Sequence, residues 1–310
     1  MQIHRSFDSL SGIKNPVVTT GTFDGVHIGH KVIINRLNSL AKNINGESVL
    51  ITFHPHPRRV LYPDTVGRKL QLINSQKEKI HLLEKAGLDH LVLINFTKEF
   101  AKTTSQEFVE GILLDKLHAK IIIVGFNHHF GHNREGDYSY LYDLTKERDF
   151  NVEEIPEQDL ENETVSSTII RKALSEGRVQ RANAYLDHFF IMNGLLKDGQ
   201  LKCKEIGFPT LELIIEEDVK LIPPEGVYAV SLNYMNERYR GMLNIKILKE
   251  SNTPSIQIHL FDYNSNAVLV GENTTVTFHK RMRDELQLDS SDNLKFQLEK
   301  DKTEIKELIY

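Results

Sequence analysis

Three glycines and two histidines lie within twelve residues near the start of the chain, in "TTGTFDGVHIGH" (19–30). The segment follows an apolar run of strand length and precedes a segment with helical periodicity. Glycine permits positive φ angles and a close approach of the backbone to a ligand. A helix N-terminus presents unpaired N–H groups and a partial positive charge, which together bind phosphate. The pattern therefore predicts a phosphate-binding turn between a strand and a helix.

The residue types in this turn suit a nucleotide triphosphate. Gly21, Gly25 and Gly29 would admit the phosphates, while His27 and His30 would donate hydrogen bonds as charge develops during group transfer. Two other interpretations fit the same residues. The histidines could be incidental to an ordinary strand-to-helix turn, or their spacing of three could place both on one helix face as a metal-binding pair.

A second candidate for phosphate binding is "VSSTIIRKAL" (165–174). Ser166, Ser167 and Thr168 stand at an expected helix start, and Arg171 follows one turn inside the helix. Hydroxyl and backbone N–H groups there could hold the outer phosphates, and a guanidinium could bind them in bidentate fashion. Taken alone, the segment could equally be a well-capped surface helix. Together with residues 19–30 it suggests the two halves of one nucleotide site.

Composition limits the classes of protein that the chain can represent. Its 310 residues favour two domains, and 40% hydrophobic with 26% charged residues is ordinary for a soluble globular protein. The net charge of -5 argues against a dedicated nucleic-acid binder. A single cysteine, Cys203, excludes an internal disulfide and fits a reducing compartment.

The termini and apolar runs give no sign of targeting to a membrane. The first residues lack an apolar core of signal-peptide length, and runs such as 121–126 are too short to cross a bilayer. We therefore expect a cytoplasmic protein whose partners are small-molecule substrates, with no nucleic-acid or membrane partner.

The first half of the chain alternates between strand-length apolar runs and helical patterns. The expected strands are 16–21, 48–53, 90–96, 120–126 and 151–155, and the expected helices are 30–43, 75–86, 104–118 and 137–148. Thr104 and Ser105 followed by Glu107 are typical of a helix start. This alternation predicts an α/β, Rossmann-like domain with a parallel sheet, which we assign to residues 1–186.

The pattern changes to short alternating runs after about residue 186. These runs span 189–196, 211–215, 226–234, 238–247, 255–263 and 274–280, with turn signals between them. They predict an antiparallel β-barrel over residues 187–310. A final helix, roughly 290–308, would turn Leu294, Leu298 and Ile305 inward.

Four segments of the first half resemble, in order, the bacterial riboflavin kinase/FAD synthetase family, whose nucleotidyltransferase domain carries an HxGH signature. They are "GTFDGVHIGH" (21–30), "TFHPHP" (52–57), "VGFNHHFGHNREGD" (124–137) and "SSTIIRKAL" (166–174). In the second half, "IGFPTLEL" (206–213), "PPEGVYAVSL" (223–232) and "RMRDE" (281–285) resemble the family's riboflavin kinase barrel.

The resemblance implies adenylyl transfer from ATP to FMN, giving FAD and pyrophosphate, with Mg²⁺ bridging phosphate oxygens. It places His27 and His30 on the ATP phosphates and Asn127 close to the reacting phosphates. Further residues follow by the same resemblance. The nucleotide turn contains Gly21, Phe23, Gly25 and Gly29. The segment on the flavin side contains Phe53, His54 and Pro55. The leaving pyrophosphate is held by Ser166, Ser167, Thr168 and Arg171. Since the FMN phosphate is itself the nucleophile, positioning and charge neutralisation are the main tasks of the protein.

The barrel departs from the family at four places that would carry kinase chemistry. Its Thr-Ala-Asn appears as Thr210-Leu211-Glu212, where Thr210 would hold Mg²⁺ in a working kinase. The family's catalytic Glu appears as Gln257, and an amide cannot take a proton as a carboxylate can. Cys203-Lys204 replaces Gly-Arg, and Lys246 replaces a glycine. These changes predict an FMN adenylyltransferase whose second domain is catalytically degenerate.

Other functions fit the same resemblance. The chain could be a fully bifunctional riboflavin kinase/FAD synthetase, or its barrel could bind flavin in a regulatory role. The first domain could also adenylylate another acceptor, such as nicotinate mononucleotide or phosphopantetheine. A zinc site among His54, His56, His128, His129 and His132 lacks the usual ligand spacings.

Overall fold

The computed structural model of the chain describes residues 1–126, 129–155, 159–160, 163–199, 201–234, 237–263, 269–286 and 290–309. The chain forms two compact units. The first contains residues 1–70 and 79–166, and the second contains residues 71–78 and 167–310. The second unit therefore includes a short segment from the first third of the chain.

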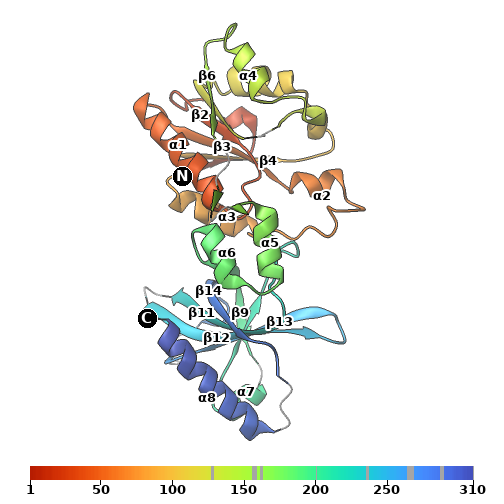
Figure 1. The fold of residues 1–310 in the computed structure, drawn as a ribbon, viewed down its shortest axis with the longest axis vertical. Helices are drawn as coiled ribbons and strands as arrows, with labels where there is room; N and C mark the ends of the chain where they lie inside the picture. Colours follow the sequence, from red (N-terminus) through yellow and green to blue (C-terminus); the bar gives the residue numbers. More distant parts are fainter. Residues whose placement is uncertain are drawn as a thin grey trace. The chain divides into compact units, whose positions relative to one another are not determined.

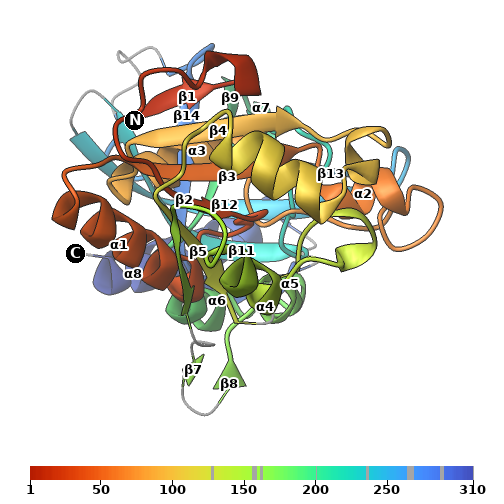
Figure 2. The ribbon, with the colours of Figure 1, turned by 90° about the horizontal axis from the view of Figure 1, so that it is seen from above.

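A six-stranded parallel sheet forms the centre of the first unit (Figures 1 and 2). Its order is β1-β4-β3-β2-β5-β6, from β1 (Gln2–His4), β2 (Val17–Thr20), β3 (Ser48–His54), β4 (His90–Asn95), β5 (Ile121–Gly125) and β6 (Asn151–Ile155). The chain moves from β2 toward β3 and β4, then crosses back to β5 on the other side of β2. Ligands of such sheets bind at the carboxyl ends of the strands where the order reverses, which here is the end of β2.

Helices cover both faces of this sheet. Helix α1 (Ile28–Asn43) and residues 79–85 of α3 (Gln76–Lys85) pack on one face, where Ile34, Leu37 and Leu83 are fully buried. Phe108 and Leu113 of a π-type helix, η3 (Glu107–Leu114), and Leu141 of α4 (Tyr138–Leu144) pack on the other. The smaller elements are η1 (Phe7–Ser9), α2 (Pro57–Leu61), η2 (Phe100–Lys102), η4 (His132–Arg134) and the short paired strands β7 (Asp159–Leu160) and β8 (Glu163–Thr164).

The start of η3 confirms the helix signal at Thr104. The Thr104 N–H donates to Glu107 Oε2 at 2.9 Å, and the Glu107 N–H donates to Thr104 Oγ1 at 3.1 Å. This reciprocal pair is a capping box, which satisfies two backbone donors at once. The Thr104 N–H and the Thr104 hydroxyl both donate to Glu107 Oε2, and these two hydrogen bonds lower the pKa of the Glu107 carboxyl.

The second unit is a closed antiparallel barrel of six strands, in the order β10-β13-β12-β11-β14-β9. The strands are β9 (Phe190–Asp198), β10 (Leu211–Ile214), β11 (Gly226–Tyr234), β12 (Glu237–Leu248), β13 (Thr253–Leu260) and β14 (Asn273–Arg283). Helix α7 (Leu201–Glu205) lies in the β9–β10 connection. Closure pairs every strand on both sides, so the barrel has no free edge.

Two helices, α8 (Ser291–Leu308) and α6 (Val179–Leu186), pack on the barrel strands, and a third helix, α5 (Ser167–Ser175), packs against α6. Ile305 of α8 is buried in a cluster with Val227, Ala229 and Met242, and Figure 1 shows α8 beside the barrel strands. Helices α5 and α6 belong to this unit as well. Asn183 of α6 joins it to the barrel, because its amide accepts the Phe190 N–H and donates to the Phe278 carbonyl.

The predicted fold class is confirmed: a parallel α/β sheet precedes an antiparallel barrel with a terminal helix. Strand β1 and helix α2 were not predicted, because three-residue and five-residue elements are too short to show periodicity.

Candidate active site

A cavity of about 1090 Å³ opens in the first unit at the carboxyl ends of β2, β3 and β5. Thr20, Phe53 and Gly125, at or near the ends of these strands, contribute to its lining. Gly21, Phe23 and His30 of the predicted phosphate-binding turn also line it. The cavity therefore lies where the strand order reverses and where the glycine-rich segment enters its helix.

The glycine-rich turn has an unusual backbone. Three residues adopt positive φ, with Phe23 at 48°, Gly25 at 93° and Val26 at 42°. Positive φ is strained for a β-branched residue such as valine, so the surroundings must hold it in place. Gly21 is required for a different reason: a Cβ there would lie 2.8 Å from the Phe23 ring. The structure thus explains why glycine stands at both positions.

The two histidines form one stack at the start of α1. The ring centroids of His27 and His30 lie 3.7 Å apart, and the Phe23 ring stacks on the other side of His30 at 4.6 Å. His27 is the N-cap residue of α1, and the first bond of the helix runs from the Lys31 N–H to the His27 carbonyl. The N–H groups of residues 28–30 therefore precede that bond, as phosphate binding at a helix N-terminus requires.

His30 is uncharged at neutral pH. Burial lowers the pKa of its imidazole well below 6.5, and the fields of His27 and Lys79 lower it further. His30 can therefore act as a neutral hydrogen-bond donor, and its buried Nδ1 has no hydrogen-bond partner among the residues that the structure describes. Lys79, which sequence reasoning missed, donates from its Nζ to the Thr22 carbonyl in the turn at 3.1 Å.

Aromatic side chains form a second wall of the cavity. Phe53, Phe96 and Phe100 contact one another with ring centroids 5.5 to 5.8 Å apart, and Phe130 also lines the space. Such a wall suits a planar ring system, because aromatic faces stack on flat ligands. Phe96 and Phe100 were not predicted. Both residues follow the carboxyl end of an apolar strand, since β4 ends at Asn95. That position in the sequence is the signal that could have indicated them as residues of the site.

The cavity carries positive charge. Arg58, Lys98, Lys102 and Arg134 line it together with His30, His129 and His132, and no Asp or Glu is among the lining residues that the structure describes. A space bordered by cations without carboxylates attracts anions. Its three features, a helix N-terminus, an aromatic wall and cationic side chains, match an anionic ligand with a flat ring.

The structure separates the three residues that were predicted to lie on the flavin side, and their contact with a flavin stays a prediction. Phe53 lines the cavity, while His54 and Pro55 are exposed and do not line it. Their neighbour His56 is buried, and its ring accepts the Arg58 N–H at the start of α2. Asn127 lies outside the residues that the structure describes.

The serine-rich motif begins helix α5, as expected. Ser167, Thr168 and Arg171 belong to α5 and to the second unit, whereas Ser166 is the last residue of the first unit. Their joint action with residues 19–30 stays a prediction.

In the barrel, Thr210 and Gln257 interact directly. The Thr210 hydroxyl donates to Gln257 Oε1 at 3.0 Å, and the Gln257 amide donates to Ser255 Oγ at 3.3 Å. Glu212 is the direct cross-strand partner of Gln257. The nearby His259 donates from Nδ1 to the Pro209 carbonyl at 2.8 Å, and burial lowers the pKa of its imidazole. An amide thus occupies the position where the family resemblance expects a carboxylate.

Among the residues that the structure describes, no helix is long and apolar enough to span a membrane. No group of three or more His, Cys, Asp or Glu side chains in those same ranges is arranged to hold a metal ion.

Comparison with known proteins identifies the class to which these two units belong. Residues 11–169 match the family model described as FAD synthetase, and residues 186–309 match that described as riboflavin kinase. The chain belongs to the riboflavin kinase/FAD synthetase family.

Curated relatives match along nearly the whole chain. The chain is 31% identical over 292 residues to the "Bifunctional riboflavin kinase/FMN adenylyltransferase" of Listeria monocytogenes, covering 93% of this chain and 90% of the relative. It is 32% identical over 309 residues to the protein of the same description from Buchnera aphidicola subsp. Schizaphis graminum, covering 97% and 96%.

A solved structure has the same fold over both units. The crystal structure described as a macrolide-efflux protein from Streptococcus pneumoniae superimposes with a TM-score of 0.87 and 28% identity, covering 98% of each chain.

Proposed function

We propose that this chain is a bifunctional riboflavin kinase/FMN adenylyltransferase. The barrel unit phosphorylates riboflavin with ATP to give FMN, and the first unit joins FMN to the adenylyl group of a second ATP to give FAD. The observation that carries the proposal is the cavity of the first unit, which combines a phosphate-binding turn, an aromatic wall and cations without a lining carboxylate. Full-length relatives of the same description support both activities.

The adenylyl transfer needs no nucleophile from the protein. An oxygen of the FMN phosphate attacks the α-phosphorus of ATP, a new P–O bond forms, and the bond to the β-phosphate breaks to release pyrophosphate. The turn around His27 and His30 binds the ATP phosphates through N–H donors, and the Phe53, Phe96 and Phe100 wall stacks on the flavin ring. The family resemblance gives Ser166, Ser167, Thr168 and Arg171 the role of holding the leaving pyrophosphate, and it gives Asn127 a role at the reacting phosphates.

Mg²⁺ is part of this proposal for both reactions. In the barrel, the hydroxyl of Thr210 and the carboxylate of Glu212 supply oxygen atoms, which are the ligands that Mg²⁺ prefers. When bound, the ion neutralises phosphate charge. The residues of the chain orient the riboflavin hydroxyl and the ATP.

The comparisons favour a working kinase over the expectation that the barrel is degenerate. Relatives that match more than nine-tenths of the chain are described as bifunctional. Glu212 lies directly across from Gln257, so a carboxylate is still present in this pair of strands. Directly paired residues have Cβ atoms about 5 Å apart on one face of the sheet, which supports Glu212 as a substitute proton acceptor.

One observation favours a second candidate, an FMN adenylyltransferase with little or no kinase activity. Gln257 cannot accept a proton, and its Oε1 already accepts the Thr210 hydroxyl. Losing a general base lowers a rate by about 10² to 10⁴. In that case the barrel would serve as a folded remnant, and FMN would come from another kinase.

Product analysis distinguishes the two candidates. The purified chain is incubated with ATP and Mg²⁺ together with riboflavin or FMN, and flavins are separated by chromatography. FMN and FAD from riboflavin would support the bifunctional enzyme. FAD from FMN, with riboflavin unchanged, would support the adenylyltransferase alone, and Gln257→Glu would then be the variant expected to create FMN from riboflavin. No FAD from FMN would overturn both candidates.

A further inference from the structure

Lys79 lies beneath the glycine-rich turn, 49 positions after His30 in the sequence. It belongs to the part of α3 that packs in the first unit, and only 8% of its surface is exposed. Its Nζ donates to the Thr22 carbonyl at 3.1 Å. Burying an ammonium is costly unless a specific interaction compensates, so this contact requires an explanation.

The Thr22 carbonyl is held from two sides. Besides Lys79, the buried Thr52 hydroxyl of β3 donates to the same oxygen at 3.2 Å. The residue that follows, Phe23, is the first of the three positive-φ residues in the turn, and its ring stacks on His30. A strained backbone persists only where its surroundings fix it. The two donors fix the Thr22 carbonyl, which directly precedes the positive-φ residue Phe23.

Lys79 also brings positive charge to a turn in which His30 is neutral. The groups whose fields reach His30 are His27 and Lys79, with Asp24 buried in the same turn. Because the pKa of His30 lies well below 6.5, that imidazole contributes no positive charge at neutral pH. The lysine ammonium is therefore a fixed cation beside the helix N-terminus.

We propose that Lys79 is a positioning residue for adenylyl transfer: it holds the Thr22 carbonyl, and hence the Phe23–His30 stack, in the geometry that receives the ATP phosphates. This inference rests on the proposed adenylyltransferase function. It adds a residue from α3, which neither the glycine-rich segment nor the serine-rich motif contains.

The test uses the full chain and four variants. Lys79→Met removes the charge and the hydrogen bond to the Thr22 carbonyl. Lys79→Arg keeps a positive charge and a side chain that can donate to that carbonyl. Thr52→Val removes only the other donor to Thr22. Lys85→Met, an exposed position on the same helix, is the matched control. The rate of FAD formation from FMN is measured against ATP concentration between pH 5.5 and 9, and the pKa of the His30 ring is measured by proton NMR, with its signal assigned from His30→Gln.

Lys79→Met should lower kcat/KM for ATP by about 10- to 100-fold, because a small displacement of a positioning group has an effect of that size. The same variant should raise the pKa of His30, since a nearby cation no longer opposes protonation. Lys79→Arg should restore most of both properties, Thr52→Val should lower the rate without moving the pKa, and Lys85→Met should match the wild type.

Two results would overturn the inference: a Lys79→Met variant with wild-type kcat/KM, or one in which the pKa of His30 does not move. If the wild-type chain makes no FAD at all, the proposed function fails. The NMR titration then still decides whether Lys79 controls the state of His30.

Discussion

His30 and His279 belong to different units, yet burial lowers the pKa of both imidazoles. At His30 this leaves a neutral donor beside a helix N-terminus, so phosphate binding does not depend on protonating the histidine. The residue types in "HIGH" (27–30) indicate hydrogen-bonding chemistry, but the protonation state of His30 depends on neighbours such as Lys79 that are distant in sequence. Burial and field are properties of the folded chain, and no local spacing encodes them.

His279 makes the stability of the barrel depend on pH. Burial lowers its pKa to about 4, the charge of Arg238 contributes, and the neutral ring accepts the Ser231 hydroxyl at 2.8 Å. In the unfolded chain the pKa returns to about 6.5, so the unfolded state binds the proton first as pH falls. Stability is therefore complete above pH 6.5 and declines as the pH falls toward 4, by about 1 to 3 kcal/mol for this group.

Urea unfolding followed by circular dichroism at pH 7 and pH 5 tests this expectation. His279→Gln should weaken the pH dependence of the unfolding free energy, whereas His118→Asn, an exposed position with positive φ that asparagine tolerates, should leave it unchanged. An equal pH dependence in His279→Gln and the wild type would contradict the assignment.

At the scale of elements, the sequence was informative wherever periodicity extended over several residues. The expected strand at 151–155 matches β6, and the expected helix at 30–43 lies within α1. The aromatic wall was not predicted as a unit, because Phe53, Phe96 and Phe100 come from different elements that only the sheet order brings together. Motif spacing found the turn, whereas tertiary contacts built the remainder of the cavity.

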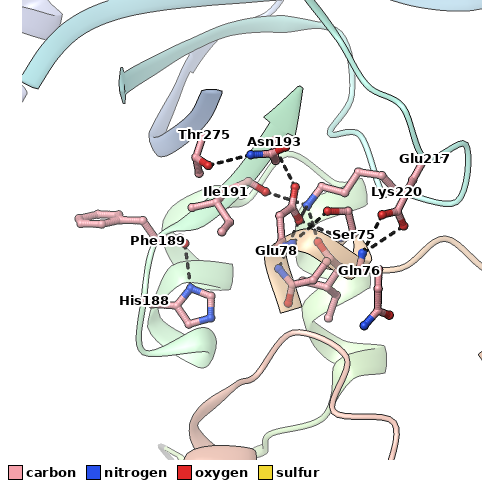
Figure 3. A network of polar contacts seen from close by, with 12 residues as sticks. Ser75, Gln76, Glu78, His188, Phe189, Ile191, Asn193, Glu217, Lys220 and Thr275 are labelled. Carbon is pink, nitrogen blue, oxygen red and sulfur yellow. Dashed lines mark hydrogen bonds and ion pairs between the residues drawn. The ribbon is translucent and has the colours of Figure 1, made fainter. Parts of the chain in front are cut away.

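Residues 71–78 belong to the barrel unit through a buried ion pair that no sequence pattern indicated (Figure 3). Lys220 and Glu78 have side chains that are 0% and 1% exposed, and Lys220 Nζ lies 2.6 Å from Glu78 Oε2. The ammonium also donates to the Ile73 and Ile191 carbonyls and lies 4.2 Å from the Phe190 ring centroid. Glu78 in turn accepts the Asn193 N–H at 2.7 Å. The pair thus ties the segment to strand β9.

Removing one partner of this pair should be strongly destabilising. Lys220→Met leaves the Glu78 carboxylate buried without its cation, which costs about 3 to 5 kcal/mol. Adding Glu78→Gln removes the buried charge and keeps an acceptor, so the double variant should regain a large part of the loss. Lys77→Met, which breaks an exposed pair with Glu216, should cost less than about 1 kcal/mol. Urea midpoints are measured for these three variants and for Glu78→Gln alone, and additive effects of Lys220→Met and Glu78→Gln in the double variant would contradict a coupled pair.

At the scale of the whole molecule, the chain has two units with separate cores. If each unit carries one of the two proposed activities, a variant in one unit should remove one activity and leave the other. His30 lines the cavity of the first unit, and Thr210 lies in the barrel. Under the proposed function, the FMN made by the barrel unit is the flavin substrate of the first unit, so each single variant should stop the two-step conversion at a different flavin.

His30→Asn should lower the conversion of FMN to FAD by about 10² or more, because a preorganised donor to the phosphates is lost, and riboflavin should then accumulate as FMN. Thr210→Val should stop FMN formation from riboflavin while FMN supplied directly is still converted to FAD. Chromatography of the flavins after incubation with ATP and Mg²⁺ separates these outcomes. Loss of both activities in either variant, with the fold retained by circular dichroism, would show that the two reactions share one site and would contradict their assignment to separate units.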